Sequence, residues 1–560
     1  MKTLLLRAAP LMLCLGLPQS ATWAQAEPST SAAIAPAPAP AVLTAEQWRA
    51  DLAFMAAEME RRHANLYHEI SRERFAAAVA DLDSRIPRLQ RNEIIVGMMR
   101  LAAMVGDGHS NVSPLKDSKF AFPSLPLKLY LFEDGIFIRA VAPGQEALLG
   151  ARVEAVGGVT AEEAIRRVGE ISPRDNVITP RLYAPVFLAM PDILQALGIS
   201  PRRDSATLTL SKGKKKWTVT VPAGAVDPNW PADTDISLVT PAGWLDARTA
   251  QPPMWLQDPL NYHRLIALPE EKALYVQLNM VADIENESLT QLGEKILAAA
   301  QAANPRAIIL DLRLNRGGNG NLRTGLIRSL IKAEDEDTHL FVLTWRGTFS
   351  ASQFILDDLD RLTKAVFIGE PASSKPSSFG DSYRIVLPNS GITVRVAIYW
   401  WQNGQNMRPW TGVDVAAPLS LADYAAGRDP ALESALRWQP RPPLGEMLTA
   451  AGKEGGMPAI DRTLAGWEAD AANRYVDLES QLAEAGQSLG WAKKYDEAIG
   501  LLELASRRFP RSSNIANVLA YVADWAGRHE LALREGRRAL ELEPNHRLAR
   551  SLVDRLSPPN

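Results

Sequence analysis

Residues 308–318 read IILDLRLNRGG, an apolar run that passes into a polar turn with two glycines. An apolar run of this length, bounded by turn residues, is typical of a strand that is buried on both faces. Glycines at the end of such a strand allow backbone amides to approach a ligand closely. The stretch therefore predicts a core strand of an α/β layer with a functional loop at its end.

The surrounding residues 262–440 alternate between strand and helix patterns. This alternation favours a sheet with parallel strands and crossover helices, in which the loops at the strand ends carry function. The expected strands are ALYVQL, AIILDLRL, HLFVLTW and AVFIGE, and the expected helices cover residues 289–302, 321–332 and 350–364. We place the boundaries of this α/β core at residues 226–440.

A helical region precedes the core. Apolar residues recur at helical spacing through residues 44–105, with Thr44 as a plausible N-cap and Gln47 three residues later. A second helix is expected over residues 91–105. These patterns predict an N-terminal helical domain over residues 44–121.

Short β-type runs follow in residues 122–225. Residues 134–158, with a helix expected from Thr160, resemble the central strands of a PDZ-like domain. The resemblance covers about forty residues, and it implies a module that binds a polypeptide by adding a strand to its sheet edge.

The last part of the chain has an internal repeat. After a connector at residues 441–480, residues 481–560 are helical in pattern and resemble tetratricopeptide repeats, which implies a surface for a protein partner or a simple cap. The pairs that lie 34 residues apart are Tyr495/His529, Ala498/Ala532, Ala505/Ala539 and Pro510/Pro544.

The N-terminus predicts export. Residues 1–26 have basic residues, a short apolar core and a small-x-small end, as in a cleavable signal peptide, and residues 27–43 form an Ala/Pro linker. The cysteine of the chain, Cys14, lies in the removed part, and Leu13 before it argues against a lipid anchor. The mature chain then has no thiol for a disulfide, a nucleophile or a metal. We expect a periplasmic or secreted protein.

The composition excludes other classes. Lys and Arg number 61 against 64 Asp and Glu, a net charge of −3, and no long basic run is present, so we expect no nucleic-acid partner. After the N-terminus no apolar run approaches about 18 residues, so we expect a soluble mature protein without a stable membrane anchor. The seven histidines form no HExxH or other zinc pattern, and we expect no metal and no cofactor.

Ser350 is the first candidate for catalysis. It follows the expected strand that ends at Trp345 and begins the expected helix over 350–364, where free N–H groups can stabilise an oxyanion. The ordinary alternative is that Ser350 only caps the helix. A GxSxG pattern at residues 486–490 lies in a helical stretch rather than after a strand, so we regard it as a chance match.

Two further segments offer a general base. Lys375 follows IGEP at residues 368–371, and His109 lies in GDGHS at residues 106–110. Each has an ordinary alternative, a solvated lysine and a turn histidine. Residue types and spacing alone leave all of these alternatives open.

Taken together, DLRLNRGG, FSASQ, IGEP and DGHS resemble the tail-specific or C-terminal-processing serine peptidases, which include the tricorn core and the interphotoreceptor retinoid-binding protein repeats. The resemblance spans residues 44–436, and residues 423–430 look like the closing segment of this family. It implies a crotonase-like layered peptidase core. It also implies Ser350 as nucleophile, Lys375 as general base, and an oxyanion hole from Gly317, Gly318 and the Ala351 amide.

His109 is the alternative base, because the branch nearest the tricorn core uses a histidine from this segment. Two positions depart from the family pattern, Gln353 where many members have Glu and Phe379 where processing enzymes have Gln. The resemblance implies an exported serine-type peptidase that cleaves unfolded or C-terminally exposed polypeptides through an acyl-enzyme. A non-catalytic peptide- or ligand-binding scaffold on the same fold remains the alternative.

A third, weaker alternative is hydrolysis of a non-peptide ester or amide. The aromatic run at residues 399–402 could line a pocket for such a substrate, although packing of these rings in the core is the expected use.

Overall fold

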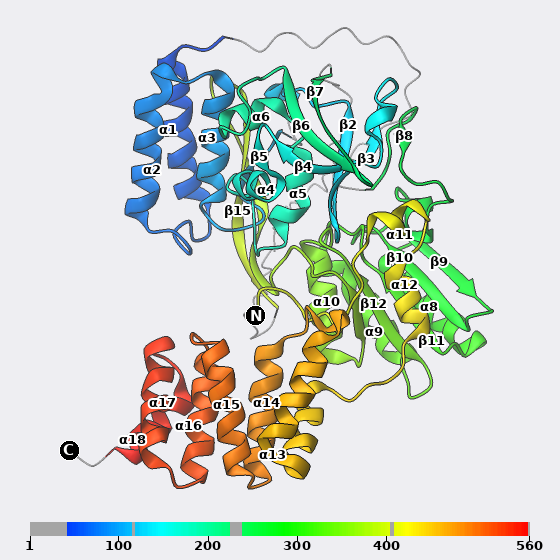
Figure 1. The fold of residues 1–560 in the computed structure, drawn as a ribbon, viewed down its shortest axis with the longest axis vertical. Helices are drawn as coiled ribbons and strands as arrows, with labels where there is room; N and C mark the ends of the chain where they lie inside the picture. The colour runs from blue at the N-terminus through cyan, green and yellow to red at the C-terminus, as the bar shows by residue number, and fades with distance from the viewer. Residues whose placement is uncertain (1–41, 115–117, 225–237, 404–407, 558–560) are drawn as a thin grey trace, which may run out of the picture. The chain divides into compact units, whose positions relative to one another are not determined.

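A computed structural model describes residues 42–114, 118–224, 238–403 and 408–557 (Figure 1). The expected signal peptide, residues 1–26, and residues 27–41 of the expected linker lie outside the described residues. Within these ranges no helix is both long and apolar enough to cross a membrane.

The expected α/β layer is confirmed. In the described ranges it is a six-stranded sheet with the order β16-β13-β12-β11-β10-β9, parallel except for β9, which pairs antiparallel with β10. The residues quoted first form β11 at its centre. The strands are β9 (His263–Leu268), β10 (Ala273–Leu278), β11 (Ala307–Asp311), β12 (His339–Thr344), β13 (Val366–Gly369) and β16 (Val415–Ala416).

Both faces of this sheet are covered, which explains why β11 is apolar from Ala307 to Leu310 and buried throughout. Successive side chains of a strand point to opposite faces. Ile308 and Leu310 pack with α8 (Leu289–Ala303), α9 (Thr324–Ala333) and α10 (Ala351–Leu362). Ile309 packs instead with α12 (Pro430–Arg437).

The N-terminal helices form as expected. Helix α1 (Ala45–Arg62) begins after Thr44, which forms a capping box with Gln47. Helices α2 (Arg72–Arg85) and α3 (Arg91–Ala103) follow, and the three lie together at one end of Figure 1. Their apolar side chains enter the same core as the β-rich region that follows.

The β-rich region contains helices that the sequence analysis does not expect. Its strands in the order β2-β3-β4-β6-β7 are accompanied by α4, and also by α5 and α6, which each begin with a proline near the first helical position. The elements are β2 (Leu127–Phe132), β3 (Gly135–Val141), β4 (Arg152–Val156), β5 (Val159–Thr160), α4 (Ala161–Gly169), α5 (Thr179–Phe187), α6 (Pro191–Ala196), β6 (Ser205–Lys212), β7 (Lys215–Pro222) and β8 (Leu245–Asp246).

A third sheet connects the N-terminal region to the core. Its order is β1-β15-β14, with β1 (Asn111–Val112), β14 (Ser377–Val386) and β15 (Thr393–Gln402). Strand β1 pairs antiparallel with β15, and Ala397 N–H also donates to Ser110 Oγ. This pairing brings the turn at residues 106–110 to β14 and β15, which lie between the core strands β13 and β16 in the sequence. Two short helices, α7 (Met254–Gln257) and α11 (Leu421–Ala425), also lie within residues 226–440.

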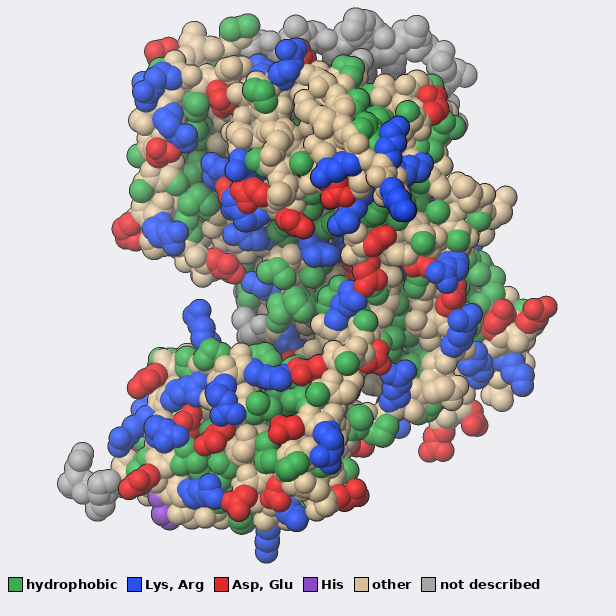
Figure 2. Space-filling model, viewed as in Figure 1, with side chains coloured by type: hydrophobic (Ala, Val, Ile, Leu, Met, Phe, Trp, Pro, Cys, Tyr) green, Lys and Arg blue, Asp and Glu red, His purple; other side chains and the backbone are tan. Residues whose placement is uncertain are grey.

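The C-terminal region is helical, and the expected connector at residues 441–480 is itself largely a helix. Helix α13 is interrupted at Gly456, whose φ is 62°. The GxSxG pattern at residues 486–490 lies within α14 rather than after a strand, which agrees with its interpretation as a chance match. The helices are α13 (Leu444–Ala469), α14 (Leu478–Trp491), α15 (Tyr495–Arg508), α16 (Ser513–Trp525), α17 (His529–Leu542) and α18 (Arg547–Leu556). Basic and acidic side chains are interspersed on the face drawn in Figure 2.

Candidate active site

Ser350 lies between β12 and α10, at the position that the sequence predicts. Its backbone has φ 58° and ψ −126°, a conformation that residues other than glycine rarely adopt and that is often found at functional sites. The side chain makes no capping hydrogen bond to α10. Instead Ser350 Oγ lies 3.0 Å from His109 Nε2. The alternative that Ser350 only caps the helix is therefore wrong.

His109 is held in place from several sides. Its N–H donates to Asp107 Oδ1 at 2.8 Å, and its carbonyl oxygen accepts from Ser382 Oγ at 3.0 Å and from Asn111 Nδ2 at 3.1 Å. Its ring stacks on Phe349 with centroids 4.6 Å apart. These contacts fix the backbone and the ring, and with them the direction of Nε2 toward Ser350.

Lys375, the other candidate base, forms an ion pair. Its Nζ donates to Glu69 Oε1 at 3.0 Å. A serine–lysine pair needs the amine in contact with the hydroxyl, and within the described residues no hydrogen bond joins Lys375 to Ser350. The neighbouring Ser374 does contact Ser350, because its Oγ accepts the Ser350 N–H at 2.9 Å.

The glycine turn lies directly against Ser350. Gly317 has φ 106°, and a Cβ there would lie 2.7 Å from Ser350 Cβ, so only glycine allows this approach. The Gly317 N–H donates to Asn315 Oδ1 at 2.9 Å. In the described part of the chain the N–H groups of Gly318 and Ala351 have no acceptor within the protein. Of the three residues expected to form the oxyanion hole, Gly318 and Ala351 therefore have amides that can donate to a substrate oxygen. Gly317 instead allows the turn to approach Ser350 closely.

Asp107 is a buried carboxylate that organises the turn before His109. Its Oδ1 also accepts the Ser110 N–H at 2.6 Å, and its Oδ2 lies 3.0 Å from His63 Nε2. Because the Asn65 N–H donates to His63 Nδ1 at 2.9 Å, Nε2 carries the ring hydrogen and donates to Asp107. Burial acts to raise the pKa of Asp107, but the bonds from His63 and Ser110 hold it below the usual value.

A second buried carboxyl group lies on the other side of the turn. Asp175 Oδ1 accepts the Gly108 N–H at 2.7 Å. Burial, and after it the charge of Asp107, raise the pKa of Asp175 to about 7. A carboxyl group that holds a backbone amide next to His109 is therefore half protonated near neutral pH.

This raised pKa predicts a pH-dependent contribution to stability. The folded state binds the proton of Asp175 more tightly than the unfolded state, so the contribution is full below about pH 4 and is lost as the pH rises through about 7. Asp175→Asn keeps an acceptor for Gly108 and removes the titration. We expect the melting temperature of the wild type, relative to Asp175→Asn, to fall between pH 4 and pH 8. A pH-independent difference between the two melting curves contradicts the assignment.

A cavity of about 570 Å³ lies beside the turn. Phe379, one of the two departures from the family pattern, lines this cavity. Its ring packs on His68 with the ring centroids 4.4 Å apart. Trp400 also lines the cavity and is 41% exposed, so the expectation that the aromatic run packs in the core is wrong for this ring. The lining includes His68, Asp107, Asp175, Lys375, Phe379 and Trp400.

A buried ion-pair network is centred on Arg313, which precedes the glycine turn in the sequence. The Arg313 guanidinium is 5% exposed and lies between two carboxylates, with Nη2 2.5 Å from Asp311 Oδ2 and Nη1 2.7 Å from Asp429 Oδ1. It also stacks over the Trp255 ring at 4.3 Å. Asp429 belongs to residues 423–430, which the sequence resemblance identifies as the closing segment.

Several residues of the site have no role in the sequence analysis. Asp107 is quoted there only as part of a motif, although an Asp two residues before a turn histidine is a signal for a side chain that accepts backbone N–H groups. Ser374 is adjacent to the proposed lysine. No local pattern marks His63 or Asp175, because their partners are distant in sequence.

No family model and no curated protein sequence matches this chain. Solved structures do resemble it. Mature CPAF is 13% identical, with a TM-score of 0.47, over 70% of this chain and 97% of its own. The photosystem II D1 C-terminal processing protease is 15% identical, with a TM-score of 0.32, over 69% of this chain and 98% of its own. The tricorn protease is 13% identical, with a TM-score of 0.28, over 70% of this chain and 36% of its own.

This chain is similar to these three solved structures. Two of them, the D1 C-terminal processing protease and the tricorn protease, are proteases by name. The site itself is described by its own contacts. Its decisive feature is a hydroxyl and an imidazole from distant parts of the chain within hydrogen-bonding distance, next to two amides that have no acceptor among the described residues.

Proposed function

We propose that this chain is an exported serine-type peptidase of the C-terminal-processing kind, which cleaves unfolded or C-terminally exposed polypeptides. The observation that carries the proposal is the 3.0 Å contact between Ser350 Oγ and His109 Nε2. A nucleophile and a general base within hydrogen-bonding distance are what acyl transfer requires, and a scaffold that only binds peptides has no need of them. The sequence motifs from residue 44 to residue 436 support the same function.

The proposed reaction uses four groups of this site. His109 Nε2 takes the proton of Ser350 as Oγ attacks the peptide carbonyl carbon. The amides of Gly318 and Ala351 donate to the carbonyl oxygen as it becomes negative. His109 then passes the proton to the leaving amine, which leaves an acyl-enzyme on Ser350. Water, deprotonated by His109, releases the acyl group.

The other parts of the chain supply accessory roles in this proposal. The β-rich module at residues 122–225 acts as the PDZ-like part and binds a substrate terminus by strand addition. The C-terminal helices act as tetratricopeptide-like repeats for a protein partner. In support, α15 and α17 begin and end 34 residues apart, which is the spacing of the sequence repeat.

The test is direct detection of cleavage and of the acylated serine. The mature protein is incubated with unfolded polypeptides, and the products are identified by mass spectrometry. In parallel, a serine-directed fluorophosphonate is added and the modified peptide is sequenced. We expect new polypeptide fragments, loss of cleavage after the reagent, and the adduct on Ser350. No fragments together with no adduct on Ser350 contradicts the proposal.

A further inference from the structure

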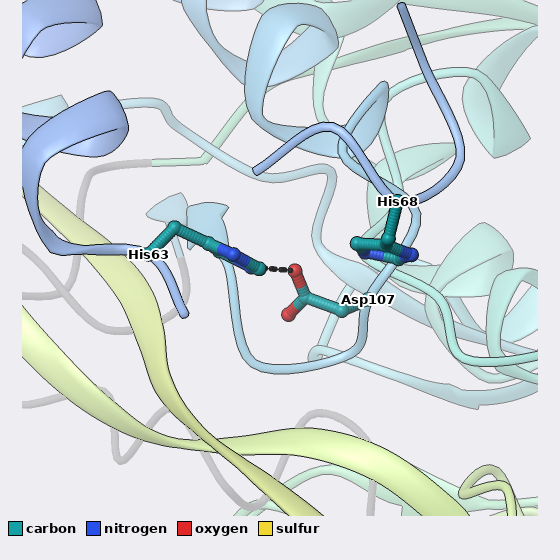
Figure 3. Close-up of side chains that lie close together, drawn as sticks. All are labelled: His63, His68 and Asp107. Atoms are coloured by element: carbon teal, nitrogen blue, oxygen red, sulfur yellow. Dashed lines mark hydrogen bonds and ion pairs between the residues drawn. The ribbon is translucent and has the colours of Figure 1, made fainter. Parts of the chain in front are cut away.

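A cluster of three side chains next to the proposed active site plays no part in the reaction above. Figure 3 shows the Asp107 carboxylate between the imidazole rings of His63 and His68. One ligand atom from each of the three residues lies within 4.8 Å of the others. The sequence contains no zinc motif here, because Asp107 is distant from the two histidines in sequence and lies next to them only in the folded chain.

Two buried polar atoms at this cluster lack partners among the described residues. In the described residues His68 Nε2 and Asp175 Oδ2 are buried and have no hydrogen bond. Both residues line the 570 Å³ cavity, together with Asp107. Buried polar atoms are normally hydrogen-bonded, and atoms without a partner indicate a bound water or ion. The cavity gives such an ion a route to the cluster.

The chemistry of the cluster favours one class of ion. Two imidazole nitrogens and a carboxylate suit Zn²⁺ and similar transition metals, whereas Mg²⁺ and Ca²⁺ need mainly oxygen ligands. The charge at the cavity also favours a cation. Lys375 pairs with Glu69, which leaves the carboxylate of Asp107 without a lysine or arginine partner among the described lining residues.

We propose that His63, His68 and Asp107 bind a zinc-type divalent cation, and that its binding slows the adjacent Ser350–His109 pair. The binding stands on the cluster alone, whereas the effect on rate rests on the proposed peptidase function. Water from the cavity completes the coordination. On binding, the ligand atoms move together to the separation of roughly 3.3 Å that a tetrahedral ion requires.

Binding changes the hydrogen bonds of His63. In the metal-free state His63 Nε2–H donates to Asp107, and Nδ1 accepts from Asn65 N–H. Coordination through Nε2 moves the ring hydrogen to Nδ1, so the Asn65 bond is lost. This cost opposes binding, so the ion exchanges with the solution and is not a permanent structural one.

The route to inhibition passes through Asp107. Its other oxygen holds the amides of His109 and Ser110. An ion on Oδ2 withdraws negative charge from the carboxylate that holds these amides. It also adds positive charge beside His109, which must become a cation in the reaction. Proton transfer from Ser350 then becomes less favourable.

Binding is tested separately from activity. Full-length mature protein carrying Ser350→Ala is titrated with ZnCl₂ by calorimetry, so that proteolysis plays no part. We expect one ion per chain, and about a 100-fold loss of affinity with His68→Phe, which keeps the packing on Phe379 and removes the nitrogen. His529→Phe, an exposed histidine on α17, is the matched control and keeps the affinity. His68→Gln is the second variant if His68→Phe does not fold.

The regulatory part is tested with the active enzyme. We expect ZnCl₂ to lower the rate at least several-fold, a chelator to restore it, and the ratio of rates with and without zinc to approach one in His68→Phe. Equal zinc affinity in His68→Phe and His529→Phe overturns the site. Binding without any change in rate overturns the inhibition alone. An inactive wild type contradicts the proposed function, and calorimetry still decides the site.

Discussion

Ser350→Ala and His109→Ala each lower kcat for peptide hydrolysis by about 10⁴-fold or more, and the double variant loses no more than the worse single variant. The reason is that hydroxyl and imidazole act as one unit, through the 3.0 Å contact between Oγ and Nε2. Either substitution removes the same proton transfer. The measurement is kcat with a fluorogenic unfolded polypeptide, with circular dichroism to confirm that each variant is folded.

The same series decides between the two candidate bases. Lys375→Ala keeps kcat within a few-fold, because its ammonium pairs with Glu69 rather than with the nucleophile. Lys295→Ala, which removes an exposed lysine paired with Glu287, is the matched control. The opposite pattern, an inactive Lys375→Ala and an active His109→Ala, assigns the base to Lys375 and refutes the histidine.

The second large effect is on stability. Arg313→Met lowers the free energy of unfolding of the core by roughly 3–5 kcal/mol, because it leaves the buried carboxylates of Asp311 and Asp429 without their shared cation. Methionine retains most of the side-chain volume, so the loss reports the charge rather than a cavity. The measurement is thermal and urea unfolding, followed by tryptophan fluorescence, since Trp255 lies against the guanidinium.

The control for this prediction is an arginine with the same type of partner at the surface. Arg437→Met removes a guanidinium that is 80% exposed and pairs with Glu433, and exposed ion pairs contribute about 0–1 kcal/mol. We expect little change there. Equal losses in the two variants show that the buried network around Arg313 adds no more to stability than a surface pair.

The sequence alone determined the layer at the centre of the protein. The apolar run at residues 307–310 indicates a strand covered on both faces, and alternation with helical spacing indicates crossover helices. Both are local properties of the chain. The position of Ser350 between a strand and a helix follows from the same patterns. Motif resemblance then named a small set of possible partners for it.

Patterns failed where local signals compete. The proline-rich stretch that holds α5 and α6 resembles turns between strands, and the connector at residues 441–480 contains glycine and proline within what is largely a helix. In both places burial of apolar side chains in a shared core stabilises helices that local propensity does not predict.

Only the tertiary structure decided which of the two candidate bases lies next to Ser350. Ser350 and His109 are 241 residues apart, and the pairing of β1 with β15 brings their segments together. Lys375 is much closer in sequence, yet it pairs with Glu69. Proximity in sequence does not fix the direction of a side chain. That direction depends on long-range strand pairing and on buried polar groups such as Asp107, which no local pattern encodes.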